Sequence, residues 1–251
     1  MFGKSSNPIL KDKMFNKETA FSSTGTMTVN GTVEKTFILL LITLAASIYT
    51  WRLFFNVGGY ENPMGAMGGW IFGGAIGGFA VAMAITFMKK YSAILAPIYA
   101  ILEGIFLGAI SAVFEAMYSG IVINAVLGTF GTFLFMLFAY RTGLIKVTDK
   151  LRAVITTATG AIAITYLISW VLGMFGVNMP FLHGNGMLSI GISLFVIIIA
   201  AFNLLLDFDM IEKASAMGAP KYMEWFGAFG ILVTLVWLYI EFLRLLSKLR
   251  D

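Results

Sequence analysis

The sequence predicts an all-α membrane protein, a bundle of seven transmembrane helices, and its composition, hydropathy and glycine content support this. The chain has 251 residues, of which 59% are hydrophobic and only 12% are charged, and its mean hydropathy is +0.89. A globular soluble domain usually has about 25% charged residues. The 27 glycines are typical of helices that pack closely in lipid. This composition excludes a soluble enzyme.

Seven segments are long and apolar enough to cross a bilayer. A spanning helix needs about 20 mostly apolar residues, because each adds about 1.5 Å toward a hydrocarbon core about 30 Å thick. The segments are residues 33–54, 67–88, 92–114, 120–140, 153–175, 187–206 and 225–246. They are separated, in chain order, by Gly58 with Gly59, Lys89 with Lys90, Ser119 with Gly120, and the stretches 141–152, 176–186 and 207–224.

The domain organisation is a polar tail, residues 1–32, followed by a transmembrane domain, residues 33–251. Lysine and arginine are concentrated in the tail and in the second, fourth and sixth connections. Because basic residues favour the cytoplasmic side, we expect a multi-pass protein of the cell (inner) membrane with a cytoplasmic, mostly flexible N-terminal tail. The net charge of +4 fits such loops better than nucleic-acid binding.

The last segment has two possible paths. If it crosses, the basic residues Arg244, Lys248 and Arg250 lie outside, against the trend of the other connections. If it re-enters, they return to the inside. Crossing is favoured, because residues 225–246 contain no proline and no glycine after Gly230.

Glycines at four-residue spacing mark the second and third segments. This spacing places them on one helix face, where a neighbouring backbone can approach closely. Packing between helices of one chain is the favoured interpretation, and homodimerisation is the alternative. The residues are Gly69, Gly73 and Gly77, then Gly74 and Gly78, and then Gly104 and Gly108.

Four carboxylates lie within or beside the apolar segments and are candidate functional residues: Glu103, Asp207, Asp209 and Glu241. An ionised side chain at the bilayer centre costs at least about 2.5 to 3.5 kcal/mol, so it tends to face a bundle interior or a wet cavity and to have a partner. Glu103 lies near mid-membrane, about 16 Å into its helix. It is either an ion or proton site or a protonated structural group.

Asp207 and Asp209 close the sixth segment and face different directions, because they are two residues apart. Asp209 is expected to be a solvated group at the helix end, paired with Lys213 one turn later. Asp207, between Leu206 and Phe208, is the better candidate for an inward-facing group. Glu241 shares a helix face with Arg244. Their ion pair is either structural or a switch in which protonation of Glu241 releases Arg244.

Motifs of common enzyme classes are missing from the sequence. It contains no phosphate-binding loop, no H-E-x-x-H and no G-x-S-x-G. Without cysteine, and with the single histidine His183, one chain cannot build a thiolate or multi-histidine metal site. Asp207 also lacks the second membrane aspartate that an aspartyl protease needs. We therefore expect no enzymatic activity, no cofactor and no resident metal.

Two strings near the C-terminus resemble the Bax inhibitor-like family, also called the transmembrane BAX inhibitor motif family, and in particular a bacterial branch of it. They are DFDMIE at residues 207–212 and YIEFLRLL at residues 239–246. The resemblance implies that the last helix is at the centre of the bundle. It also implies a calcium leak pathway that responds to pH and is closed by two hydrogen-bonded aspartates, one on the sixth helix and one on the seventh.

Asp207 matches the first of these aspartates, and two residues compete for the second position. Counting along the connection from Asp207 suggests Thr234, whereas the local string suggests Glu241. The two are seven residues apart on one helix face, so both can line the same pathway. Threonine would leave a weaker response to pH. A basic partner expected on the second helix is missing from its middle, and Lys89 and Lys90 are the nearest candidates.

The leading hypothesis is a passive, pH-sensitive pathway for cations, most plausibly calcium, with Asp207 at a cytoplasmic gate and Glu103 and Glu241 deeper. Calcium favours six to eight oxygen ligands, so a few scattered carboxylates suit transit better than storage. A second hypothesis is a non-transporting regulator whose tail helps it bind a membrane protease or another membrane partner. A third is proton-coupled transport.

Overall fold

The computed structural model describes residues 25–56, 61–177 and 179–250, and within them it is a helical bundle without a sheet. Seven helices are long and apolar enough to cross a membrane, which confirms the expected fold class. The shorter elements are the 3-10 turn η2 (Lys89–Tyr91) and α7 (Pro180–His183). The long helices are α2 (Val29–Asn56), α3 (Pro63–Phe87), α4 (Ser92–Met117), α5 (Ile121–Arg141), α6 (Asp149–Met174), α8 (Met187–Ala216) and α9 (Met223–Lys248).

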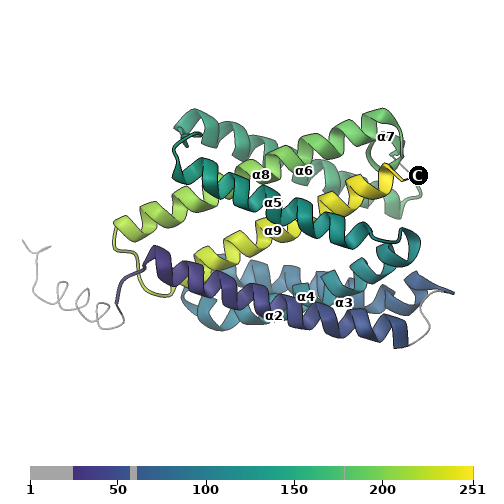
Figure 1. Cartoon of the computed structure of the whole chain (residues 1–251), viewed down its shortest axis with the longest axis horizontal. Coiled ribbons are helices and arrows are strands. Elements are labelled where there is room, and N and C mark those ends of the chain that lie inside the picture. The colour runs from purple at the N-terminus through teal and green to yellow at the C-terminus, as the bar shows by residue number, and fades with distance from the viewer. Residues whose placement is uncertain (1–24, 57–60, 178, 251) are drawn as a thin grey trace, which may run out of the picture.

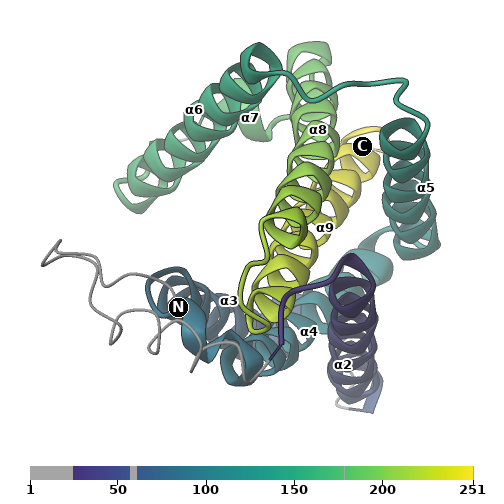
Figure 2. The same ribbon diagram turned by 90° about the vertical axis from the view of Figure 1, so that its left-hand side faces the viewer.

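Helix α9 lies at the centre of the bundle, as the family resemblance implies. It packs against α2, α4, α5 and α8, and Figure 1 shows it inclined between α2, α3 and α4 on one side and α5, α6 and α8 on the other. Helices α3 and α6 lie at the periphery, where α3 packs mainly on α4 and α6 mainly on α8 (Figure 2). The most buried helix therefore packs against helices of both groups.

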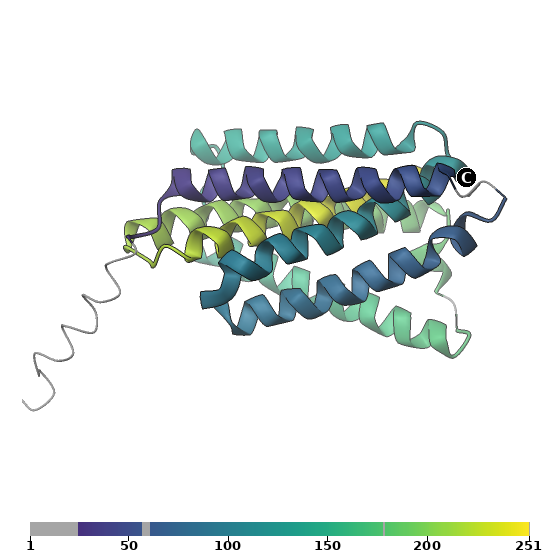
Figure 3. The ribbon, with the colours of Figure 1, turned by 90° about the horizontal axis from the view of Figure 1, so that it is seen from below.

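Helix α9 runs without a break through the bundle. Its first turn lies at the end where α2 begins, and its last turn lies at the opposite end (Figure 3). Its 26 residues measure about 39 Å at 1.5 Å per residue, enough to span a bilayer. The fold therefore has the crossing helix that the sequence favours and not the re-entrant alternative.

The sixth spanning helix is longer than expected. The sequence places its end at residue 206, but α8 continues to Ala216, about 15 Å further. Charges on this extension are neutralised locally, because Asp209 forms ion pairs with Arg152 of α6 and, at 2.9 Å, with Lys213. Asp207 therefore lies inside a helix and not at its end.

The last residues of the predicted tail belong to the folded bundle, while residues 1–24 lie outside the described part of the chain. Helix α2 begins at Val29, earlier than the expected residue 33. Met27 is buried, and its N–H donates to Ala219 O at 2.7 Å. The N–H and hydroxyl of Thr28 both donate to Oε1 of the fully buried Glu224, at 3.0 and 2.9 Å. These hydrogen bonds to a carboxylate at the start of α9 thus hold the beginning of α2 against α9.

The glycines divide into two groups by what lies next to them. A Cβ atom at Gly104 would collide with Thr43 O and with Ala46, so this glycine lets α4 approach the backbone of α2. Gly108 is equally close to α2, and Gly74 and Gly78 face α4; a Cβ at Gly77 would meet Leu102 at 3.3 Å.

Gly69 and Gly73 do not pack against another described helix, which corrects the expectation for these two. A Cβ atom at either would meet nothing within 4 Å. The two series of glycines lie on different faces of α3. The face that meets α4 carries Gly74 and Gly78, and the outward face carries Gly69 and Gly73.

Gly104→Ala should destabilise the protein by about 1–3 kcal/mol, because its methyl group overpacks the contact between α4 and α2. Gly73→Ala is the matched control and should raise stability by about 0.5–1 kcal/mol through helix propensity alone. Thermal unfolding of both purified variants in one detergent measures the difference. Equal melting temperatures for the two variants would contradict the α2–α4 packing.

Candidate functional site

A cavity of about 600 Å³ lies between α3, α4, α8 and α9, and it brings together three of the predicted site residues. Glu103 comes from α4, Asp207 from α8 and Thr234 from α9, and all three line it. Most of the other lining residues are apolar. The carboxyl groups therefore face a common space inside the part of the molecule that is apolar enough to span a membrane.

Asp207 is joined directly to Thr234. The Thr234 hydroxyl donates to Asp207 Oδ2 at 2.6 Å, and Thr234 is 7% exposed. The hydroxyl oxygen is also 3.2 Å from Gly230 O, one turn earlier on α9. Of the two residues that the sequence left open, Thr234 is the one that pairs with Asp207.

Glu103 has a neighbour that the sequence analysis missed. Tyr99, one turn earlier on α4, is 3% exposed and lines the same cavity as Glu103. Its ring stands edge-on to Phe229 of α9, with the ring centroids 4.9 Å apart. A Cβ atom at Gly78 would lie 2.8 Å from Glu103 Oε1, so this glycine lets the carboxyl group lie close against α3. The four-residue spacing of Tyr99 and Glu103 was the available signal.

The cavity offers oxygen atoms but no preformed metal site. Calcium takes six to eight oxygen ligands, whereas the side chains that line this cavity supply two carboxyl groups and three hydroxyl groups. Among the described residues no group of three or more His, Cys, Asp or Glu side chains is placed to hold a metal ion. No lysine or arginine in the described part of the chain lines the cavity, and Lys89 instead lies 5.0 Å from the centroid of the Phe226 ring.

Glu241 lies in a separate cluster and not in the cavity, which corrects the expectation that it shares a pathway with Thr234. The predicted pair with Arg244 is present, with Nη1 2.6 Å from Oε1. The Tyr166 hydroxyl of α6 donates to the same oxygen at 3.0 Å, and the guanidinium carbon is 4.8 Å from the centroid of the Tyr166 ring. Because α9 is inclined (Figure 1), one of its faces meets different neighbours two turns later.

Lys248 extends this cluster toward the C-terminus. The sequence places this basic residue on the outer side of the membrane if the last segment crosses, and the structure adds that Lys248 is buried, at 6% exposed. Its ammonium group donates to Leu182 O and Ser193 Oγ, both at 2.9 Å, and to Ser189 O at 3.3 Å. The end of α9 is therefore tied to α7 and to the beginning of α8.

Asp209 also does not line the cavity. Its expected pair with Lys213 is present, but Arg152 adds a second cation and the Asp209 side chain is only 11% exposed. The expectation of a solvated group is wrong, because α6 covers this position. Asp209 therefore stabilises the contact between α6 and α8.

Comparison with known proteins identifies a family. The family described as Bax inhibitor 1 like matches residues 7–251, nearly the whole chain. No curated protein and no solved structure matches the chain.

Arg244→Gln should destabilise the protein by about 3–5 kcal/mol, because it leaves Glu241, which is 1% exposed, as a buried charge without a cation. Adding Glu241→Gln should recover part of this loss, since the pair is then neutral. Tyr166→Phe should cost less, about 1 kcal/mol for one hydrogen bond. Chemical denaturation in mixed micelles measures all three variants.

Arg250→Gln is the control for removal of a basic residue from the same region, because Arg250 is exposed and donates to Ser119 O at 2.6 Å. It should change stability little. A double variant that is as unstable as Arg244→Gln alone would show that the Glu241 charge is not the cause.

Proposed function

This chain belongs to the Bax inhibitor 1 like family, and we propose that it forms a passive, pH-sensitive pathway for cations, calcium in particular. It is a multi-pass membrane protein with seven apolar helices. In this proposal it resides in the cell (inner) membrane with its N-terminus in the cytoplasm, has no enzymatic activity, and meets the cation only in transit.

The observation that carries the proposal is the common cavity of Glu103, Asp207 and Thr234. Keeping carboxyl groups inside a membrane bundle is costly, and such groups mark ion and proton pathways. The small number of oxygen ligands favours weak, transient binding over storage. A passive pathway needs a site that a cation both enters and leaves.

The contact between Asp207 and Thr234 provides the gate in this proposal. The hydrogen bond of 2.6 Å links α8 to α9, so opening would separate these helices at that level. Ionised carboxylates attract a cation into the cavity, and protonation removes the attraction. Cation flux should therefore rise with pH while Asp207 and Glu103 ionise.

Asp207→Asn should lower calcium flux at neutral pH and remove most of its pH dependence, because the amide cannot ionise. Glu103→Gln should lower flux in the same direction. Purified protein in liposomes that contain a calcium-sensitive dye gives the flux at each pH. Glu34→Gln is the charge control, since this side chain is 70% exposed. Unchanged flux in Asp207→Asn would defeat the assignment of the gate.

Thr234→Val should raise calcium flux, because it keeps the side-chain shape but removes the hydrogen bond to Asp207. Thr86→Val is the matched control. Thr86 lines the same cavity, but its hydroxyl donates to Ala82 O at 2.9 Å. The same liposome assay compares the two variants, and equal flux in both would show that the Thr234 hydroxyl does not close the pathway.

A second candidate function is a non-transporting regulator that binds a membrane protease or another membrane partner. The observation that favours it is the contact of Met27 with the α8–α9 connection and of Thr28 with the first turn of α9, which would couple a partner on the preceding residues to the bundle. In this case purified protein conducts no ion, and deletion of residues 1–24 abolishes co-purification of one stoichiometric partner. For the cation pathway, the same deletion should leave flux unchanged, since Thr28 and Glu224 remain.

A further inference from the structure

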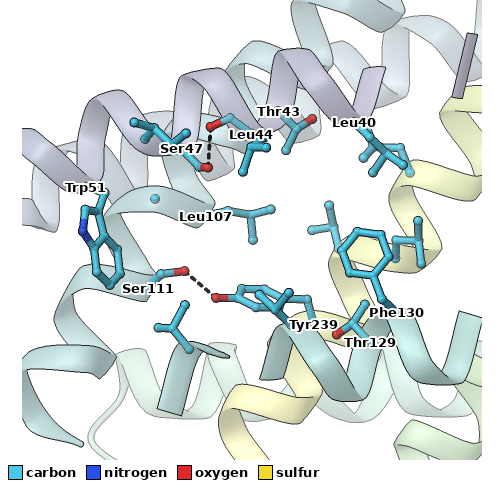
Figure 4. Close-up of a pocket in the computed structure, with 17 residues that line it drawn as sticks. Leu40, Thr43, Leu44, Ser47, Trp51, Leu107, Ser111, Thr129, Phe130 and Tyr239 are labelled. Atoms are coloured by element: carbon cyan, nitrogen blue, oxygen red, sulfur yellow. Dashed lines mark hydrogen bonds between the residues drawn. The ribbon is translucent and has the colours of Figure 1, made fainter. Parts of the chain in front are cut away.

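A second cavity, of about 360 Å³, lies on the other side of α9, between α2, α4, α5 and α9. Figure 4 shows Leu107 in its middle, Trp51 at one end, and Leu40 and Phe130 at the other. Its lining contains no charged residue. The proposed cation pathway does not use this space.

The hydroxyl groups of this cavity already have partners. Ser47 donates to Leu44 O at 2.8 Å, and Thr129 donates to Ala125 O at 2.8 Å. Ser111 and Tyr239 hydrogen-bond to each other at 2.7 Å (Figure 4). An occupant therefore gains little from polar groups, and hydrocarbon fits this lining best.

The cavity opens between α2 and α5 on the outer surface of the bundle. Helices α2 and α5 both pack on α4 or α9 but not closely on each other. Lining residues on both sides of the opening are exposed, including Leu44 and Ile48 of α2 and Phe130 of α5. In a membrane, the phase that reaches this opening is the lipid hydrocarbon.

A basic side chain lies at one end of the opening. Arg52 follows Trp51 and lies one turn beyond Ile48, so it extends the helix face that lines the cavity. It is exposed, and no ion pair joins it to a carboxylate within the described residues. It lies about 18 Å along α2 from Leu40 at the far end. Arginine near the end of a spanning helix can bind an interfacial phosphate.

We propose that the crevice between α2 and α5 binds one acyl chain of an anionic phospholipid, whose phosphate group pairs with Arg52. The lipid comes from the leaflet at the C-terminal end of α2. The apolar lining recognises the chain, and the charge of Arg52 selects the headgroup. Such a lipid would contact α9 opposite the Asp207 cavity.

Native mass spectrometry of the full-length protein tests this proposal with phosphatidylglycerol and phosphatidylcholine of identical acyl chains. The unmodified protein should retain one phosphatidylglycerol more strongly than phosphatidylcholine. Arg52→Gln should weaken phosphatidylglycerol binding about fivefold, the size expected for one exposed ion pair. Arg141→Gln, at an exposed position outside the crevice, should leave the preference intact.

Val126→Phe tests the position of the acyl chain, because Val126 lines the cavity. It should weaken binding of both lipids, whereas Leu127→Phe should not, since Leu127 is 64% exposed and lies outside the lining. Ile48→Trp, at an exposed lining position, repeats the test if Val126→Phe does not fold. Equal binding of both lipids, or a preference that survives Arg52→Gln, would overturn the phosphate assignment. Unchanged lipid binding in Val126→Phe and Ile48→Trp would overturn the assignment of the acyl chain to the crevice.

Discussion

Every polar group inside a bundle that faces hydrocarbon needs a partner within the protein, and in this chain α9 supplies such partners along its whole length. Four residues spaced along that helix each bind a different neighbour: Glu224 binds Thr28 before α2, Thr234 binds Asp207 of α8, Glu241 binds the α6 tyrosine, and Lys248 binds α7 and the start of α8. Lipid supplies no hydrophobic force between helices. These contacts therefore specify how the helices are arranged around α9.

Close packing and open space alternate around this central helix. Gly104 and Gly108 bring α4 against α2, and Gly74 and Gly78 bring α3 against α4, so these three helices form one tightly packed group. The contact of α4 with α9 lacks such a series of glycines. One cavity lies on each side of that contact, the polar one toward α3 and α8 and the apolar one toward α2 and α5. The two cavities thus have linings of different polarity, and α9 forms a wall of both.

The sequence was sufficient for the fold because long apolar segments have few alternatives in a membrane. It was also sufficient to single out Asp207, as a carboxylate next to an apolar run. It could not select Thr234 over Glu241, because both lie on one face of α9 and only the inclination of that helix decides which neighbour each meets. Arg152 and Asp209 lie 57 residues apart, and no local pattern links them. The burial of Lys248 depends on carbonyl oxygens, which leave no trace in a sequence.

A threonine as the partner of Asp207 changes how a response to pH can arise in the proposed pathway. Two hydrogen-bonded carboxyl groups can share one proton, so their titrations are coupled. Thr234 does not titrate in this range, and so the contact between α8 and α9 gains or loses charge only on Asp207. The second titrating group of the cavity is Glu103 on α4. When both carboxylates are ionised they repel each other, and a divalent cation between them relieves that repulsion. The charge that attracts a cation is therefore divided between α4 and α8, whereas the hydrogen bond that holds the gate belongs to α8 and α9.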